Sequence, residues 1–300
     1  VFIAGMLVGV ADDYARLCDL SGETAEAAYS RERKLLMVDA VEKYGWDGNW
    51  FLRAYDANGE KVGSDECKEG KIFVEPQGMC VMAGIGVANG MAQKALDATR
   101  EHLMFDYGVV LNWPAYQEYH LNLGEISSYP PGYKENGSVF CHNNPWVVIA
   151  ETELGHGDRA FDVYRRTAPA YIEDQQLHRT EPYVYSQTVN GKESYKPGEA
   201  KNSWLTGTAA WNFFAVSQAM LGVKPELDGL KLDPCLPGHI HHVTIHREFR
   251  GNRYEIEIQN RAGGEKGAVQ VIVDGVALAG QTIPATADTG KTYRVEVTVG

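Results

Sequence analysis

The chain has 300 residues, 44% of them hydrophobic, and 40 acidic against 28 basic residues give it a formal net charge of −12. This length can form one large domain or two ordinary ones, because single hydrophobic cores stop growing at about 250–300 residues. The acidic balance and the lack of a lysine- and arginine-rich cluster argue against a nucleic-acid-binding surface.

The apolar opening of the chain predicts neither a signal peptide nor a membrane span. Residues 1–11 lack a basic leading region and are followed at once by Asp12 and Asp13, so the stretch is too short to cross a bilayer. Residues 1–18 instead predict a buried helix without an N-terminal cap. We therefore expect residue 1 to lie in the middle of a domain, so that the chain is a fragment or a processed product.

Helical periodicity continues along the first three quarters of the chain. It predicts further helices at residues 22–43, 78–105, 143–154, 157–171 and 204–221. A hairpin is predicted around Asp56 to Gly59, between the first two of these helices.

From Gly229 onwards apolar and polar residues alternate with period two, which is typical of antiparallel strands in a sandwich. The predicted fold is mainly α with β, and a boundary near 226–229 separates residues 1–228 from residues 229–300.

The cysteines indicate a reducing compartment. They are odd in number and contain no CxxC pair, which favours reduced thiols in a cytoplasmic protein and no structural zinc. They are Cys18, Cys67, Cys80, Cys141 and Cys235.

Two long segments between helices, residues 107–141 and 172–203, are the most informative about function. Loops this long are usually functional or disordered, and these are too rich in aromatic residues for disorder. They alternate aromatic side chains with Asn, Gln, Glu and Lys, a mixture that binds sugars through ring faces and hydroxyl hydrogen bonds. The sequence therefore predicts a carbohydrate pocket.

Several blocks, in these loops and elsewhere along the chain, resemble the inverting disaccharide phosphorylases of glycoside hydrolase family 94. They are PGYKENGSVFCHNNPW, RTAPAY, HRTEPYVYSQ, GEAKNSWLTGTAAW and LKLDPCLP. The resemblance covers nearly the whole chain and implies the second half of an (α/α)6 barrel followed by a small antiparallel β-sandwich domain. It also implies a glycosyltransferase that is commonly a homodimer.

The resemblance assigns binding residues but no catalytic residue within this chain. It implies phosphate-binding positions at His142, Thr206 and Gly207, and sugar-binding positions at Tyr129, Lys134, Glu135 and Gln187. The family's general-acid Asp lies in a DWNDGMN-type segment that does not occur here, so we expect it upstream of Val1, in an N-terminal remainder of the same enzyme.

The chemistry of the reaction explains these residue types. Inverting phosphorolysis needs one carboxylic acid on the leaving oxygen, while phosphate attacks the opposite ring face in place of an activated water. Phosphate is then a substrate, and neither a cofactor nor a metal is expected. His142, Thr206 and Gly207 can supply an imidazole N–H, a hydroxyl and a backbone N–H at helix starts, where anions are favoured.

The resemblance implies conversion of cellobiose and phosphate to α-D-glucose 1-phosphate and D-glucose. The ring of Tyr129, at the position of the acceptor sugar, would crowd an N-acetyl group. Two alternatives remain open: another β-linked substrate such as N,N'-diacetylchitobiose or laminaribiose, and a non-catalytic carbohydrate-binding fragment that lacks the acid.

Simpler interpretations exist for each candidate. His142 can pack or cap a helix, Thr206 can be an ordinary N-cap, and Lys134 with Glu135 can form a solvated ion pair.

Two other groups attract attention for catalysis or metal binding. Asp47 lies between tryptophans, but a turn role is favoured over a general acid. The histidines of the HxHH region alternate between the two faces of a strand, so a metal site is disfavoured. They are His239, His241, His242 and His246.

Overall fold

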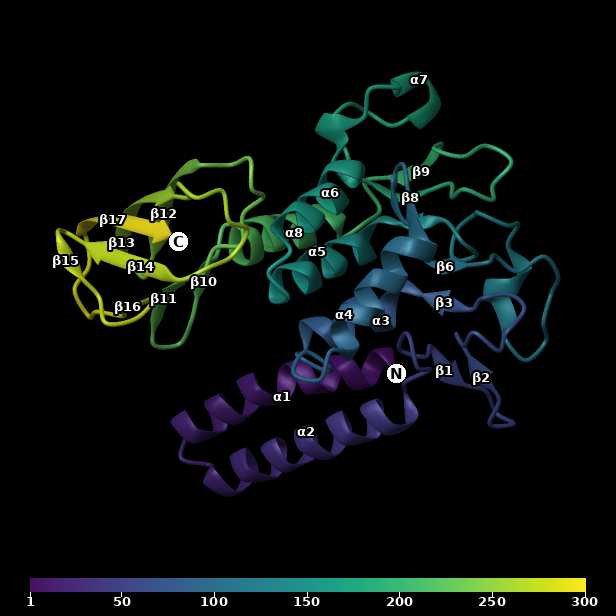
Figure 1. Cartoon of the computed structure of the whole chain (residues 1–300), viewed down its shortest axis with the longest axis horizontal. Helices are drawn as coiled ribbons and strands as arrows, with labels where there is room; N and C mark the ends of the chain where they lie inside the picture. The colour runs from purple at the N-terminus through teal and green to yellow at the C-terminus, as the bar shows by residue number, and fades with distance from the viewer. The chain divides into compact units, whose positions relative to one another are not determined.

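The computed structural model describes residues 1–300 as a mixed α and β fold (Figure 1). It divides into two compact units, residues 1–150 with 163–211 and residues 151–162 with 212–300. The predicted boundary at 228 falls within the second unit, in the turn between the paired strands β10 (Val223–Pro225) and β11 (Gly229–Leu232). The division into 1–228 and 229–300 therefore stays a prediction. None of the helices has the length and apolar character that a membrane crossing requires.

Most of the predicted helices are present. Their bounds are α1 Phe2–Leu20, α2 Thr24–Tyr44, α3 Val74–Met82, α4 Met91–Ala98, α5 Asn144–Glu153, α6 Gly157–Thr167, α7 Gln175–His178 and α8 Thr208–Phe214. The helix predicted at 157–171 is shorter, because Pro169 opens a separate 3-10 turn. The helix predicted at 204–221 begins later, at Thr208, and continues as a π-helical segment to Met220.

The single helix predicted at 78–105 is wrong. α3 ends at Met82 and α4 begins at Met91, and Gly84, Gly86 and Gly90 between them have φ values of 80°, 77° and 81°. Such left-handed positions interrupt a helix and are readily adopted only by glycine. The apolar periodicity continued through this segment, which is why the break did not show in the pattern.

α1 and α2 form an antiparallel helical hairpin (Figure 1). Ala15, Cys18 and Ala27 make a small core between them, and the Ser30 hydroxyl donates to the carbonyl of Ala11 at 2.9 Å. Gly5 lets α1 approach α3 closely, since a Cβ there would lie 3.2 Å from the Cys80 nitrogen. The helices thus pack through small residues, while larger apolar side chains of α1 such as Ile3 and Val10 stay exposed.

Short strands connect the loops of the first unit. The bounds are β1 Ala54–Tyr55, β2 Lys61–Val62, β3 Ile72–Phe73, β4 Met104–Phe105, β5 Gly108–Val109, β6 Asn112–Trp113, β7 Val139–Phe140, β8 Ser186–Val189 and β9 Ala200–Ser203. The predicted hairpin is confirmed as the antiparallel pair β1 and β2. Asp56 closes its turn by accepting the N–H groups of Asn58 and Glu60.

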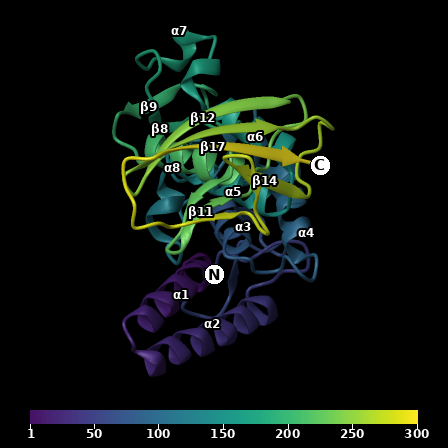
Figure 2. The same ribbon diagram turned by 90° about the vertical axis from the view of Figure 1, so that its left-hand side faces the viewer.

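The second unit contains a β-sandwich whose two sheets share one hydrophobic core. One sheet has the order β10-β11-β16 and the other β12-β13-β17-β14-β15 (Figure 1). Figure 2 shows β12, β14 and β17 of the larger sheet together with β11 of the smaller one. The remaining bounds are β12 His242–Phe249, β13 Asn252–Gln259, β14 Val269–Val273, β15 Val276–Ala277, β16 Thr282–Pro284 and β17 Thr292–Val299. The expectation of purely antiparallel strands is wrong, because β13 and β17 pair in parallel.

Candidate active site

A three-stranded sheet joins the two long loops that carry the candidate residues. β7 and β9 each pair antiparallel with β8, so they run in the same direction and end at the same edge of the sheet. β7 is followed by the turn that holds His142, and β9 by the segment that holds Thr206 and Gly207. β8 begins at this edge, with Gln187 as its second residue. The edge therefore gathers residues from three separate stretches of sequence.

Aromatic contacts link the two helix starts beyond this edge. The Trp146 and Trp211 rings meet edge to face, with centroids 5.8 Å apart. His142 lies against Trp146 with a centroid distance of 5.4 Å. Each tryptophan follows its candidate residue, His142 or Gly207, by about one helical turn. The Trp146 and Trp211 contact thus holds the starts of α5 and α8 side by side.

The imidazole of His142 is held by ring contacts alone. Phe140 also packs against it edge to face, with centroids 4.9 Å apart, and neither ring nitrogen has a hydrogen-bond partner in the protein. Burial lowers the pKa of His142 below its usual value. At neutral pH the ring is therefore uncharged, with one nitrogen able to donate and the other able to accept.

Cys141, next to His142, is not a nucleophile. Its side chain is buried, its sulfur lies 3.7 Å from the Ser186 hydroxyl, and burial raises the pKa of its thiol to about 12. A thiolate is therefore not populated at neutral pH, and thiol catalysis requires the thiolate.

Thr206 and Gly207 differ in what they leave available. The Thr206 hydroxyl accepts the N–H of Thr208 at 3.1 Å and lies 2.5 Å from the Thr208 hydroxyl. The N-cap position itself is Gly207, because its carbonyl accepts the N–H of Trp211 and α8 begins at the next residue. Gly207 is exposed, and its N–H makes no backbone hydrogen bond. The nearest atom to a Cβ at Gly207 would be Cδ1 of Trp211, at 3.8 Å. The N–H of Gly207 at this helix start is therefore free to bind a ligand.

Tyr129, Lys134 and Glu135 form a second cluster in the same loop. The Lys134 ammonium lies 5.2 Å from the centroid of the Tyr129 ring, a cation–π distance. The Tyr129 hydroxyl donates to Glu125 at 2.9 Å. One carboxylate oxygen of Glu135, Oε2, is buried without a hydrogen-bond partner. Lys134 and Glu135 form no ion pair with each other, so each keeps hydrogen-bonding capacity for a polar ligand.

Gln187 is oriented by its neighbour on β9. Its side-chain oxygen accepts the amide of Asn202 at 2.9 Å, which leaves the Gln187 NH2 group without a partner. Asn202 has a φ of 54°, an uncommon conformation that asparagine tolerates better than most residues. No hydrogen bond or ion pair connects Gln187 or His142 to the cluster of Tyr129, Lys134 and Glu135.

Asp47 has a structural role, as its predicted turn position implies. Its carboxylate accepts the Ser64 hydroxyl at 2.8 Å and the Asp65 N–H at 2.7 Å.

The histidines of the second unit make separate contacts. His242 pairs with Glu257, His241 donates to the carbonyl of Asn260, and His239 packs against Phe161.

Sequence reasoning missed Trp146, Trp211 and Asn202. The signal for the tryptophans was their spacing, because each stands one helical turn after a candidate residue at a helix start. Asn202 had no such signal, since its role depends on the register between β8 and β9.

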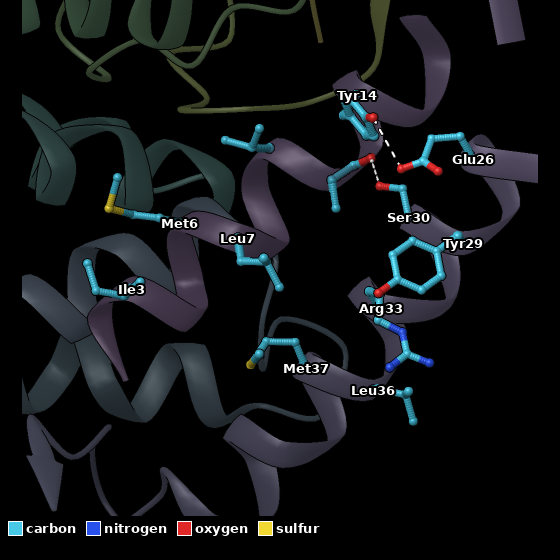
Figure 3. Close-up of a pocket in the computed structure, with 12 residues that line it drawn as sticks. Ile3, Met6, Leu7, Tyr14, Glu26, Tyr29, Ser30, Arg33, Leu36 and Met37 are labelled. Atoms are coloured by element: carbon cyan, nitrogen blue, oxygen red, sulfur yellow. Dashed lines mark hydrogen bonds between the residues drawn. The ribbon is translucent and has the colours of Figure 1, made fainter. Parts of the chain in front are cut away.

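A large cavity lies away from this edge, between α1 and α2 (Figure 3). Its volume is about 740 Å³, and its lining is mostly apolar, with Ile3, Met6 and Leu7 on one side and Leu36 and Met37 on the other. Its polar lining residues come mostly from α2, and two of them already have partners, since Glu26 accepts the Tyr14 hydroxyl and Ser30 donates to the carbonyl of Ala11. The chemistry of the side chains, rather than the size of a cavity, therefore identifies the candidate site.

The lowered pKa of His142 predicts a specific dependence of stability on pH. The unfolded chain takes up a proton near pH 6.5, before the folded protein does, so acidification through this range lowers the free energy of unfolding. We expect His142→Gln to reduce this loss. The check is the thermal midpoint of the complete enzyme and of its His142→Gln variant at about pH 7 and about pH 5.5. His178 stays unchanged in both, because burial lowers its pKa too. Equal falls in both proteins would contradict the assignment.

Comparison with known proteins identifies a family and several relatives. Residues 1–222 match the family described as the glycosyl hydrolase 94 superfamily, catalytic domain. The chain is 35% identical over 292 residues to N,N'-diacetylchitobiose phosphorylase of Vibrio proteolyticus, covering 96% of this chain and 36% of that protein. It is 35% identical over 267 residues to solabiose phosphorylase of Paenibacillus borealis, covering 89% of this chain and 34% of that protein. The chain spans about a third of the length of these curated relatives.

Solved structures with low sequence identity share the fold. A sialidase aligns with a TM-score of 0.56 and 14% identity, covering 81% of this chain and 22% of that one. A GH78 family rhamnosidase of Bacillus sp. GL1 aligns with a TM-score of 0.50 and 16% identity, covering 97% of this chain and 26% of that one. At these identities the likeness concerns the fold alone.

Proposed function

Because this chain belongs to the glycosyl hydrolase 94 superfamily, we propose that it is part of an inverting phosphorylase of β-linked disaccharides. The observation that carries the proposal is the edge of the β7-β8-β9 sheet. There an uncharged His142 and the free N–H of Gly207 lie at two neighbouring helix starts. In the proposed enzyme these helices belong to the second half of an (α/α)6 barrel. The remainder of the enzyme supplies the general-acid Asp.

The proposed reaction exchanges one bond at the anomeric carbon for another. A phosphate oxygen attacks that carbon while the bond to the leaving sugar oxygen breaks, and the general acid protonates this oxygen. His142, Thr206 and Gly207 hold the phosphate in line for attack. An uncharged imidazole suits this task, because it can donate a hydrogen bond without neutralising the nucleophile. Phosphate is consumed as a substrate, and the proposal needs no cofactor.

The second cluster serves the sugar in this proposal. Glu135 accepts sugar hydroxyls with its unpartnered Oε2, and Lys134 and the NH2 group of Gln187 donate to them. Tyr129 fixes the Lys134 ammonium through the cation–π contact and presents its ring to the acceptor sugar. The enzyme is further proposed to be a homodimer, on the strength of the sequence resemblance, and cytoplasmic, because of its cysteine usage.

Cellobiose is the substrate that we propose, with α-D-glucose 1-phosphate and D-glucose as products. The test incubates the complete enzyme with cellobiose, with and without phosphate, and measures both products. Formation of both products only when phosphate is present supports the proposal. Glucose release without phosphate would identify a hydrolase, and sugar binding without turnover would identify a carbohydrate-binding protein.

A second candidate substrate is N,N'-diacetylchitobiose, since the relative from Vibrio proteolyticus is named for it. Laminaribiose is the remaining alternative. The same assay distinguishes them when each disaccharide is supplied at equal concentration.

We expect Tyr129→Val to shift acceptor choice toward N-acetylglucosamine. The smaller side chain opens the space that an acetamido group needs, and it removes the ring from the glucose. The ratio of kcat/KM for N-acetylglucosamine to that for glucose should rise by a factor that corresponds to a free energy of about 1–3 kcal/mol. The assay is disaccharide synthesis from α-glucose 1-phosphate with each acceptor.

Tyr129→Phe is the matched control, because it keeps the ring and loses only the hydrogen bond to Glu125. It should retain the preference for glucose. A parent enzyme that already prefers N-acetylglucosamine would show the cellobiose assignment to be wrong.

A further inference from the structure

Two buried tryptophans in the first unit differ in how their indole N–H groups are satisfied. Trp50 is 4% exposed, and its Nε1 donates to the carbonyls of Gly63 at 2.9 Å and Lys71 at 3.0 Å. Trp146 is 7% exposed, and its buried Nε1 has no partner. An unpaired buried donor costs about 1–3 kcal/mol, and a buried Trp N–H usually has a partner. Trp146 therefore presents a donor for which the chain itself provides no acceptor.

The neighbours of Trp146 fix the position of its ring. Phe2 stacks on it with centroids 5.5 Å apart, and Trp211 meets it edge to face. Its backbone is held close to α3, since a Cβ at Gly78 would lie 3.1 Å from the Cβ of Trp146. The indole is thus confined by aromatic rings and backbone, none of which accepts its hydrogen bond.

The indole also lies beside the candidate phosphate position. Side chains in a helix lean toward its N-terminus, so Trp146 in the first turn of α5 leans toward His142, whose ring is 5.4 Å away. An indole whose N–H has no partner thus contacts an imidazole that itself has no hydrogen bond in the protein.

We propose that the indole N–H of Trp146 is a further donor to the bound phosphate, next to His142. The inference rests on the proposed phosphorolysis and extends it to one more binding residue. An indole can only donate, so its partner must offer a lone pair, as every unprotonated phosphate oxygen does. The start of the ten-residue helix α5 favours an anion over a neutral hydroxyl at this place.

The test compares Trp146→Phe with Trp50→Phe in the complete enzyme. Both changes remove a buried indole N–H and keep an aromatic ring, but only Trp50 has partners within the protein. We expect Trp146→Phe to raise the KM for phosphate about tenfold or more, the loss typical of a hydrogen bond to a charged group, with little change in the KM for the disaccharide. Trp50→Phe should lower the thermal midpoint and leave both KM values unchanged.

A second readout does not depend on turnover. Inorganic phosphate should raise the thermal midpoint of the parent enzyme, because a ligand stabilises the state that it binds, and should raise that of Trp146→Phe less. If Trp146→Phe lowers the midpoint without phosphate as much as Trp50→Phe does, and keeps the parent KM for phosphate, the N–H has a protein partner and the inference is wrong. A parent enzyme that gains stability from phosphate but does not cleave disaccharides would overturn the proposed reaction and leave the phosphate contact in place.

Discussion

Replacing His142 with alanine in the complete enzyme is expected to raise the KM for phosphate and to lower turnover, with little effect on disaccharide binding. The imidazole is uncharged at neutral pH and has no hydrogen bond within the protein. Both of its ring nitrogens are therefore available to hydrogen-bond a ligand. Loss of one positioned donor to a developing or bound anion costs about 2–4 kcal/mol. Initial rates are measured while the phosphate concentration and then the disaccharide concentration is varied. These rates separate the effect on phosphate binding from the effect on disaccharide binding.

His120→Ala is a suitable control for this experiment. His120 is also partly buried, but its ring is hydrogen-bonded at 3.0 Å to Glu69, which lies in another loop. Its replacement should leave the KM for phosphate unchanged. Equal losses of phosphate and disaccharide affinity in His142→Ala, or no loss of either, would show that His142 does not hold phosphate.

Residues 1–300 expressed alone are expected to self-associate and to show no phosphorolysis. One face of α1 exposes large apolar side chains at helical spacing, with Ile3 68%, Val10 62% and Leu17 52% exposed, and part of this face lines the cavity of Figure 3. Contiguous apolar patches of this kind are rare on soluble monomers. Light scattering and the binding of a hydrophobic dye measure the association.

Polar substitutions on this apolar face of α1 should benefit residues 1–300 expressed alone but harm the complete enzyme. Changing Ile3, Val10 and Leu17 to Gln should make residues 1–300 less prone to associate, but should destabilise the complete enzyme by roughly 1.5–3 kcal/mol for each side chain that is buried there. Leu121→Gln is the control, because Leu121 is 85% exposed and lies outside the hairpin. A soluble, monomeric chain of residues 1–300 with a sharp thermal transition would contradict this expectation.

Local sequence patterns determined the helices α1, α2 and α5, the β1 and β2 hairpin, and the change to strands near Gly229. Periodicity records which side chains of one segment face a core, and this property survives without knowledge of neighbouring segments. The same property explains why the pairing direction of the strands was predicted wrongly. Alternation is identical for parallel and antiparallel partners, so the parallel pairing of β13 with β17 left no trace in the pattern.

The candidate site shows the same division between sequence and tertiary structure. The residue types around His142 and Thr206 were visible as helix starts in the sequence, and the resemblance suggested their ligand. Only the register of β7, β8 and β9 brought them to one edge, and only packing showed that Trp146 joins them with an unpaired N–H. Hydrogen-bond satisfaction depends on atoms distant in the chain, because partners are supplied by folding. The sequence by itself thus determined the kinds of groups in the site, and the tertiary structure decided which of them remain free to bind.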